Sequence, residues 1–285
     1  MMKTSVKLSP IVLLLALIAV VPAASAASKS LTIGLNAWAE NIAVAHLWKH
    51  LLDSRGYHVK LTTAQEGVTW MGVARGQMQM SMDIWLPNTD APYYKRYKHR
   101  INLVGPWFQE AKLGLVVPQY APVNTIAGLR KHAKDFKVEG TPAILGTAPG
   151  DSEMKMTRHA IKAYHLPMKL IASSQAGMMA GLKRAYRHHR DIVVTLWSPH
   201  WAWAEYKLKY LKDPKHIYGK GDHIYVITET GFAHKYPKIQ RWISHWHMSA
   251  HQLASLEDDI KKQGNAKGVD AWIHHNRHLI HQWIQ

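Results

Sequence analysis

Residues 31–63 read LTIGLNAWAENIAVAHLWKHLLDSRGYHVKLTT and contain the pattern that decides the fold. The apolar run over residues 31–37 is typical of a strand, whereas the apolar side chains of residues 42–52 recur at helical spacing. Gly56 is expected to end the helix, because a residue without a Cβ readily adopts positive φ. Residues 58–63 then return to a strand pattern. The stretch therefore predicts a strand–helix–strand unit with parallel strands.

The same rhythm continues along the chain and then restarts. A helix near residues 68–75 and a strand over 80–85 complete the first α/β unit. The segment Gly114-Leu115-Val116-Val117-Pro118 precedes the second unit. After it we expect helices over 125–136, 154–164 and 175–187, strands over 143–147, 168–172, 192–197 and 223–228, and a mostly helical tail from residue 238.

This order predicts an α/β protein of two lobes, each a sheet flanked by helices. We expect lobe 1 to comprise residues 29–112 and 223–285, and lobe 2 to comprise residues 113–222. Two close crossings, near residues 112 and 223, would suit a hinge with a cleft between the lobes. The chain has no cysteine, so no disulfide framework can support the fold.

The N-terminal segment has the three parts of a secretory signal. Residues 1–7 carry two lysines, residues 11–21 are apolar, and Ala24-Ser25-Ala26 offers small residues for cleavage. A membrane anchor is the alternative, but the apolar run is shorter than the ~20 residues that a spanning helix needs. We predict a signal peptide over residues 1–26, cleaved after Ala26, and export to a periplasm.

The chain is strongly basic, with a formal net charge of +17 and 20 histidines. Such an excess can indicate a nucleic-acid or anionic-membrane partner. Here the Lys and Arg residues are spread along the chain without long basic runs, and an exported protein seldom meets nucleic acid. We therefore expect no nucleic-acid partner, and we hypothesise that the surface is adapted to an acidic exterior.

Enzyme and metal signatures are sparse. The sequence contains no Gly-x-Ser-x-Gly elbow, no Walker-type phosphate loop and no His-Glu-x-x-His, so no cofactor is expected. A turn over residues 148–152 could lead into a helix whose N-terminus favours an anion. His274, His278 and His281 follow helical spacing and could bind a metal, although a solvated histidine-rich face is the simpler interpretation.

The tryptophans are the most informative residues. The chain has 12 Trp and only 3 Phe, which core packing alone would not select. Trp38, Trp85 and Trp197 each end a predicted strand, where α/β proteins place their ligands. An indole face attracts cations, quaternary ammonium groups among them. The helical tryptophans are expected to serve packing instead: Trp48, Trp70, Trp242 and Trp272.

Five segments of the chain resemble one known family in order. They are Asn36-Ala37-Trp38-Ala39-Glu40-Asn41, Trp85-Leu86-Pro87-Asn88-Thr89, residues 114–118, Trp197-Ser198-Pro199-His200-Trp201 and Leu208-Lys209-Tyr210-Leu211-Lys212-Asp213-Pro214-Lys215. Together they span nearly all of the chain after the predicted signal. The chain resembles the glycine betaine-binding proteins of osmoprotectant ABC importers, the OpuAC-like family of periplasmic substrate-binding proteins.

The resemblance implies a two-lobed periplasmic-binding-protein fold with the ligand in the cleft. It implies that Trp38, Trp85 and Trp197 form a cage around the quaternary ammonium group. It also implies that backbone amides of Ser152 and Glu153 hold the ligand carboxylate. A membrane permease is the implied partner, and we expect a monomer that is not an enzyme.

Two positions depart from the family pattern. Asp90 replaces a histidine, and Glu153 stands where a small or apolar residue is usual. An ionised Asp90 would repel a ligand carboxylate. Glu40 lies near the position at which an acidic residue contacts the hydroxyl of choline in choline-binding relatives. Glycine betaine is the first expectation, and a choline- or carnitine-specific protein of the same fold is the alternative.

Two other classes remain open from the residues alone. An exported enzyme could use Asp90, Glu153 or His200 as acid–base groups, although no nucleophile–base spacing supports it. A metal-binding protein could use the histidine-rich C-terminal segment.

Overall fold

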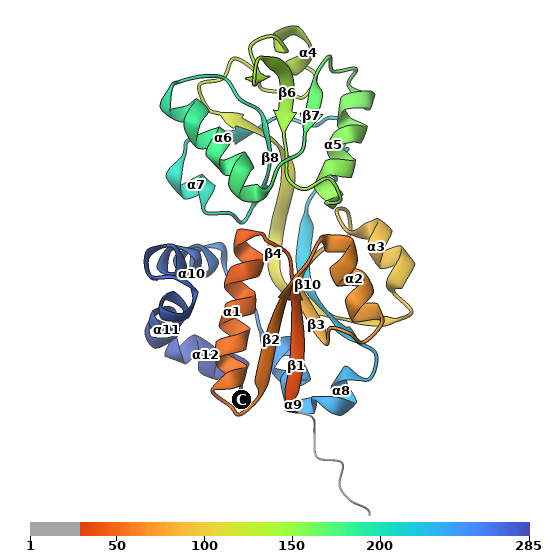
Figure 1. Cartoon of the computed structure of the whole chain (residues 1–285), viewed down its shortest axis with the longest axis vertical. Helices are drawn as coiled ribbons and strands as arrows, with labels where there is room; N and C mark the ends of the chain where they lie inside the picture. The colour runs from red at the N-terminus through yellow and green to blue at the C-terminus, as the bar shows by residue number, and fades with distance from the viewer. Residues whose placement is uncertain (1–28) are drawn as a thin grey trace, which may run out of the picture.

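Three parallel strands form the centre of the lower lobe in Figure 1, which shows a computed structural model describing residues 29–285. β1 (Ser30–Leu35) pairs in parallel with both β2 (His58–Thr63) and β3 (Met80–Leu86). α1 (Ala39–Asp53) and α2 (Glu66–Ala74) make the two crossovers. The predicted first α/β unit is therefore confirmed. The predicted signal peptide over residues 1–26 lies outside the described residues.

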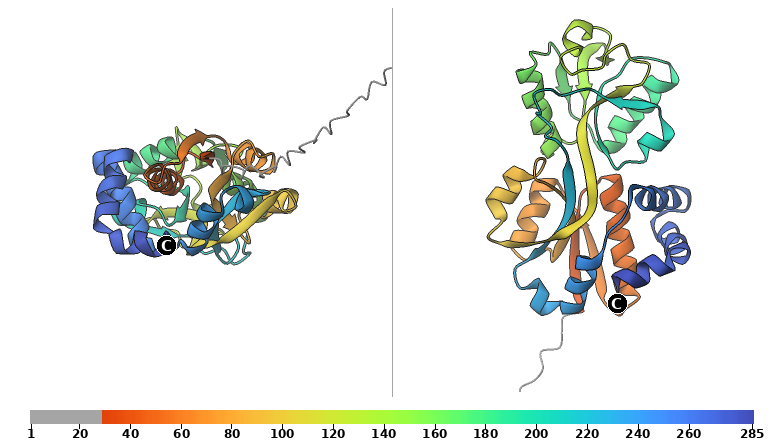
Figure 2. Two further views of the ribbon diagram at one scale, coloured as in Figure 1. Left: turned by 90° about the horizontal axis from the view of Figure 1, so that it is seen from below. Right: turned by 180° about the vertical axis from the view of Figure 1, so that it is seen from behind.

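β4 (Ile101–Pro118) is one long strand that runs from the lower lobe into the upper lobe (Figure 2, right). Its first part pairs antiparallel with β10 (Asp222–Glu229), which also pairs antiparallel with β3. Its last part pairs antiparallel with β8 (Val194–Ser198) and β9 (Leu208–Tyr210). The strand order is β2-β1-β3-β10-β4-β8-β6-β5. One continuous hydrogen-bonded path therefore links the sheets of the two lobes.

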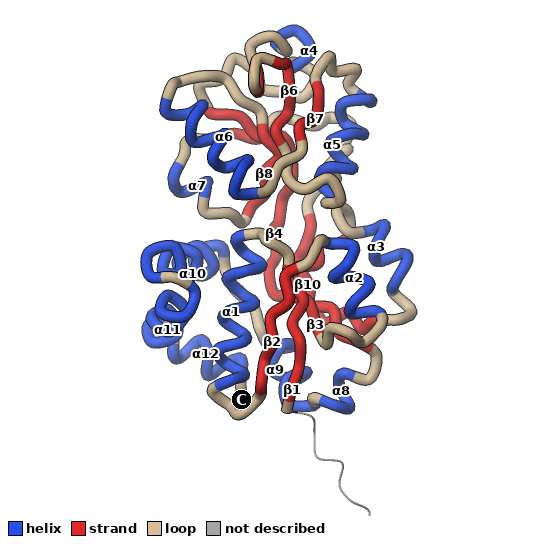
Figure 3. Tube along the Cα trace, viewed as in Figure 1, coloured by secondary structure: helices blue, strands red, loops and turns tan. Residues whose placement is uncertain are grey.

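The upper lobe repeats the α/β arrangement. β6 (Thr141–Leu145) pairs in parallel with β7 (Lys169–Ile171) and β8, and antiparallel with β5 (Lys137–Val138). The helices of this lobe are α4 (Leu129–His132), α5 (Ser152–Ala163), α6 (Gln175–Arg187) and α7 (Ala202–Glu205). Figure 3 shows strands at the centre of each lobe and most helices on the outside. The predicted fold class, two lobes with helix-flanked sheets, is confirmed.

The expected helix over residues 125–136 is wrong in most of its length, because only α4 is helical there. Thr125 instead forms a parallel bridge with Lys212, and the Ile126 N–H donates to the Lys212 carbonyl at 3.0 Å. These backbone hydrogen bonds hold the start of the segment in an extended conformation. The short helix α3 (Ala91–Tyr97) was not predicted.

The chain after β10 forms the remaining helices of the lower lobe. They are α8 (Phe232–Lys235), α9 (Pro237–His245), α10 (Ala250–Gln263), α11 (Asn265–His275) and α12 (Arg277–Trp283). α10 and α11 pack against α1 (Figure 1). Trp246 stacks on Trp107 at 4.4 Å between ring centroids and meets Trp48 edge-on at 5.4 Å. The tryptophans predicted to serve packing, Trp48, Trp70, Trp242 and Trp272, are all buried.

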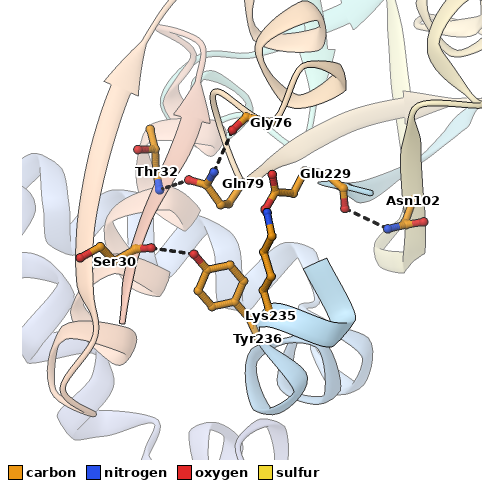
Figure 4. Close-up of polar contacts among 8 residues, drawn as sticks. All are labelled: Ser30, Thr32, Gly76, Gln79, Asn102, Glu229, Lys235 and Tyr236. Carbon is orange, nitrogen blue, oxygen red and sulfur yellow. Dashed lines mark hydrogen bonds and ion pairs between the residues drawn. The ribbon is translucent and has the colours of Figure 1, made fainter. Parts of the chain in front are cut away.

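Polar contacts join β10 and the residues after it to β1 and to the start of β4 (Figure 4). The Tyr236 hydroxyl donates to the Ser30 carbonyl at 2.6 Å, and the Lys235 ammonium lies 2.9 Å from the buried carboxylate of Glu229. Asn102 donates from its amide to the Glu229 carbonyl at 2.9 Å. Within residues 29–285, no helix has both the length and the apolar character needed to cross a bilayer.

Candidate functional site

A pocket lies where the two lobes meet, with about 330 Å³ of space between atoms, open solvent included. All seven residues predicted as ligand-binding from the sequence line it. Its lining is Trp38, Glu40, Glu66, Trp85, Thr89 and Asp90 from the lower lobe, and Leu113, Asp151, Ser152, Glu153 and Trp197 from β4 and the upper lobe. Residues far apart in the sequence therefore converge on one site, as the strand ends predicted.

Three indole rings reach the pocket from three different elements. Trp38 immediately precedes α1, Trp85 lies near the end of β3, and Trp197 lies near the end of β8. The rings of Trp38 and Trp197 have centroids 6.3 Å apart and planes inclined by 59°. The Trp85 indole N–H donates to Oδ1 of Asp83 at 2.7 Å, which fixes the orientation of that ring. Trp85 and Trp197 are buried and Trp38 is partly buried.

Asp90 is fixed by its own turn and by Glu66. Its Oδ2 accepts the Trp85 N–H at 2.8 Å, and its own N–H donates to the Trp85 carbonyl at 2.8 Å. Its carboxyl group also forms a hydrogen bond with that of Glu66. Burial, followed by the charge and hydrogen bond of Glu66, raises the pKa of Asp90 well above its ordinary value. The raised pKa of Asp90 favours its uncharged form, which would weaken the repulsion expected between Asp90 and a ligand carboxylate.

Glu66 was missed in the sequence interpretation. It is the first residue of α2, only 3% exposed, and its Oε2 accepts the Ser152 N–H at 2.7 Å. Its Oε1 accepts the Ser152 hydroxyl at 2.5 Å. Its position directly after a parallel strand was the available signal, since that edge of a sheet is where ligands bind.

Two other pocket carboxyl groups are buried as well. Glu153 accepts hydrogen bonds from the hydroxyls of Thr147 and, at 3.4 Å, Thr195, and burial raises its pKa to about 8. Burial and the nearby charges of Asp83 and Glu257 raise the pKa of Glu40 well above its ordinary value. Burial favours the uncharged form of each acid.

Within the part of the chain that the structure describes, no Lys, Arg or His side chain lines the pocket. Carboxyl groups and indole faces provide its electrostatic character. Both features favour a positively charged group of low desolvation cost, because the indole quadrupole attracts cations and any pocket acid that is ionised adds negative potential. The pocket is therefore suited to binding a cation.

The turn over residues 148–152 does lead into a helix, as the sequence indicated. Oδ2 of Asp151 accepts the Ala148 N–H at 3.1 Å, and α5 begins at the next residue. The first helical N–H, that of Ser152, is bound by the Glu66 carboxylate. The anion at this helix N-terminus is thus a side chain of the protein itself.

His200 does not line the pocket. Its ring meets that of Trp197 edge-on, with centroids 5.1 Å apart. Its Nε2 is 2.9 Å from the Gln175 amide nitrogen, and its Nδ1 accepts the Ala202 N–H at 3.0 Å. Burial lowers its pKa to about 3, so the ring is neutral. Gln175 also accepts the Ala39 N–H at 3.0 Å, a direct hydrogen bond between the lobes. His200 therefore supports the pocket wall from outside.

The histidine cluster expected on one helical face is not formed. α11 ends at His275 and α12 begins at Arg277, so His274 lies on a different helix from His278 and His281. Nδ1 of His274 is 2.6 Å from the Arg277 guanidinium. Among residues 29–285, no three His, Cys, Asp or Glu side chains are placed to hold a metal ion.

Known proteins share both the sequence pattern and the fold. The chain is 29% identical over 180 residues to the glycine betaine/carnitine transport binding protein GbuC of Listeria monocytogenes serotype 1/2a (strain 10403S). That alignment covers 61% of this chain and 59% of GbuC, so the chain matches about three-fifths of this relative's length.

Two solved structures superpose on nearly the whole described chain. Lactococcal OpuAC, in its closed conformation with glycine betaine, has a TM-score of 0.83 and 28% identity, covering 90% of this chain and 100% of that one. ProX of Borrelia burgdorferi, a glycine betaine/L-proline-binding protein, has a TM-score of 0.85 and 24% identity, covering 90% and 97%; this second likeness shows the fold. The family described as the substrate binding domain of ABC-type glycine betaine transport systems, OpuAC, matches residues 29–274, and the chain belongs to that family.

Proposed function

We propose that this protein is the extracytoplasmic substrate-binding component of an ABC importer, and that it binds glycine betaine or a closely related quaternary-ammonium compound. The observation that carries the proposal is the convergence of Trp38, Trp85 and Trp197, from both lobes, on one pocket without a cationic side chain in its lining. The protein then delivers its ligand to a membrane permease and does not act as an enzyme.

The tryptophan cage supplies the affinity for the ammonium group. A quaternary ammonium carries its charge on methyl groups that form no strong hydrogen bonds with water, so it is cheap to desolvate. Each desolvated cation–π contact is worth on the order of 1–2 kcal/mol. The inclined rings of Trp38 and Trp197, with Trp85, provide aromatic surface on several sides of one cation.

The other end of the ligand faces the polar side of the pocket. In the glycine betaine hypothesis, backbone amides at Ser152 and Glu153, at the start of α5, hold the ligand carboxylate as a helix N-terminus favours. Asp90 and Glu40 complete that side. In the choline or carnitine alternative, Glu40 accepts the ligand hydroxyl. The acidic lining, with five carboxyl-bearing residues, favours choline, which has no carboxylate.

The lobes and the localisation belong to the same proposal. We place the lobe boundaries at residues 29–112 with 223–285, and at 113–222. The pairing of Ala111 with Asp222, next to that of Lys112 with Ser198, supports a change of lobe there. We also propose cleavage near Ala26, a periplasmic location and a monomeric state.

Calorimetric titration tests the proposed function directly. Glycine betaine, choline, carnitine and proline betaine are each titrated into the mature protein at pH 4 and at pH 7. Saturable 1:1 binding of at least one of them is expected. If none binds at either pH, the proposal is rejected. Metal analysis of protein purified without an affinity tag, and turnover assays with bound ligand, address the metal-binding and enzyme classes.

A further inference from the structure

The start of α5 already holds a carboxylate from the opposite lobe. Ser152 is the first residue of this 12-residue helix, and its N–H and hydroxyl both donate to Glu66, at 2.7 and 2.5 Å. The preceding Asp151 makes no side-chain capping hydrogen bond to the helix. Since a helix N-terminus carries partial positive charge, Glu66 occupies the position that suits an anion best.

Asp90 strengthens this arrangement from the side. Its carboxyl group is hydrogen-bonded to that of Glu66, which raises the pKa of Asp90 and opposes the effect of burial on the pKa of Glu66. Burial raises the pKa of both acids, but Ser152 donates its N–H and its hydroxyl to Glu66 at a helix N-terminus, which favours Glu66 as the ionised member of the pair. Two donors of Ser152, its N–H and its hydroxyl, then hold the Glu66 carboxylate, with the carboxyl group of Asp90 beside it.

The charge on Glu66 has no cationic partner within the pocket. The basic residue that acts on it is Lys155, whose ammonium group instead donates to the Tyr93 hydroxyl at 2.8 Å and lies over the Tyr93 ring at 4.1 Å. Asp83 and Glu153 also experience the charge of Glu66, which raises the pKa of each. A positively charged ligand would compensate this carboxylate, whereas a second carboxylate would be repelled by it.

We propose that Glu66 is a specificity-determining residue that takes the place of a ligand carboxylate at the start of α5, so that the pocket prefers quaternary-ammonium cations without a carboxylate over zwitterions. The proposal rests on the proposed function and narrows its ligand class. A cation carrying a hydroxyl, such as choline, places its charge against the indoles and needs no anion site. Glycine betaine has to compete with Glu66 for the Ser152 donors.

The test compares three ligands by calorimetry at pH 7.5: tetramethylammonium, choline and glycine betaine. Wild-type protein is expected to bind choline at least ~10-fold more tightly than glycine betaine, because two like charges a few ångströms apart repel strongly at a partly buried site. Glu66→Gln keeps the size of the side chain and can still exchange hydrogen bonds with Ser152, but it removes the charge. It is expected to reduce the choline-to-glycine betaine preference at least ~10-fold.

Glu229→Gln is the matched control. Glu229 is a buried carboxylate of the same lobe, paired with Lys235 at the far end from the pocket (Figure 4), and it does not line the site. The ratio of the two affinities is expected to stay at the wild-type value in this variant. Glu66→Ala provides a second variant without charge.

Each outcome decides one question. Glycine betaine binding as tightly as choline to the wild-type protein overturns the proposal, even if neither Glu66 variant folds. A folded Glu66→Gln protein with the wild-type ratio also overturns it, while leaving the proposed function intact. Failure of all three ligands to bind the wild-type protein also overturns this proposal, and the titrations with carnitine and proline betaine at pH 4 and pH 7 then decide whether the proposed function stands.

Discussion

Trp38 and Trp197 belong to opposite lobes, yet their ring centroids lie only 6.3 Å apart and their planes are inclined by 59°. The backbone elements that carry them, the start of α1 and the end of β8, meet only because the lobes contact each other around the pocket. This ring pair therefore depends on the relative position of the lobes. The aromatic surface offered to a ligand at the proposed site therefore depends on how far the hinge between the lobes is closed.

Replacing any one cage tryptophan with alanine should weaken binding. Trp38→Ala, Trp85→Ala and Trp197→Ala are each expected to cost about 1–2 kcal/mol of binding free energy, the scale of a desolvated cation–π contact. Calorimetry with the preferred ligand measures the loss. Trp201→Ala is the control, because Trp201 belongs to the same sequence segment as Trp197 but does not line the pocket. Three single variants with parental affinity would disprove the cage.

Ligand should draw the lobes together. Because the proposed cage takes rings from both lobes, a bound cation stabilises the arrangement in which they meet. Small-angle scattering is expected to give a smaller radius of gyration at saturating ligand than without it. Trp38→Ala at the same ligand concentration should show a smaller fraction of compact protein. A radius that does not respond to saturating ligand would argue for a rigid molecule.

Asp90→His should shift preference toward glycine betaine. A protonated histidine next to Glu66 would neutralise the carboxylate, whereas the native acid leaves it charged. At neutral pH we expect stronger glycine betaine binding and weaker choline binding. In the wild-type protein, acid is expected to protonate Glu66, whose pKa burial raises, so glycine betaine should bind more tightly at pH 4 than at pH 7 and choline should show the opposite trend.

Asp90→Asn is the matched control for that experiment. It keeps a side-chain oxygen for the Trp85 N–H but introduces no positive charge. Comparing the affinities for the two ligands separates an effect on specificity from an effect on stability, since a general loss of folding would weaken the binding of both ligands. An affinity ratio that Asp90→His leaves unchanged would show that Asp90 does not influence the ligand.

Buried carboxyl groups should make the protein less stable at alkaline pH. Burial raises the pKa of Glu257 to about 8, from about 4.3 in an unfolded chain. A raised pKa in the folded state contributes stability that is fully present below the unfolded value and is lost as pH rises through about 8. Glu257→Gln should therefore raise the melting temperature at pH 9 relative to wild type, with a much smaller change at pH 5.

Asp258→Asn, an exposed change on the same helix, is the control for helix effects. It removes only a surface ion pair with Lys262. Such a pair typically contributes less than ~1 kcal/mol to the free energy of unfolding. Its effect should be similar at both pH values. If Glu257→Gln raised the melting temperature equally at pH 5 and pH 9, the raised pKa of Glu257 would be contradicted.

Much of the fold was predictable because strand and helix periods are clear in the first unit, where residues 58–63 match β2 in full. β4 was not recognised as one strand because Gly105-Pro106 is typical of a turn. In the structure, the β10 pairing shifts register next to the Tyr225–Pro106 pair, and such an irregularity accommodates a proline without a ladder N–H. Tertiary pairing thus overrides the local turn signal.

The candidate site could be predicted from the sequence only in part. The ends of strands locate Trp38, Trp85 and Trp197, because the edge of an α/β sheet is a general ligand position. Glu66 was missed because an acidic residue in the first turn of a helix is common and usually serves the helix dipole. Its contact with Ser152 joins residues 86 positions apart, and no local pattern predicts such a contact.

A crystal structure with the tightest-binding of the four titrated compounds tests the central claim most directly. The account predicts the quaternary nitrogen within ~6 Å of the ring centroids of Trp38, Trp85 and Trp197, the range of a cation–π contact. A saturating ligand bound elsewhere, or bound in the pocket with its ammonium group directed away from these rings, would contradict it.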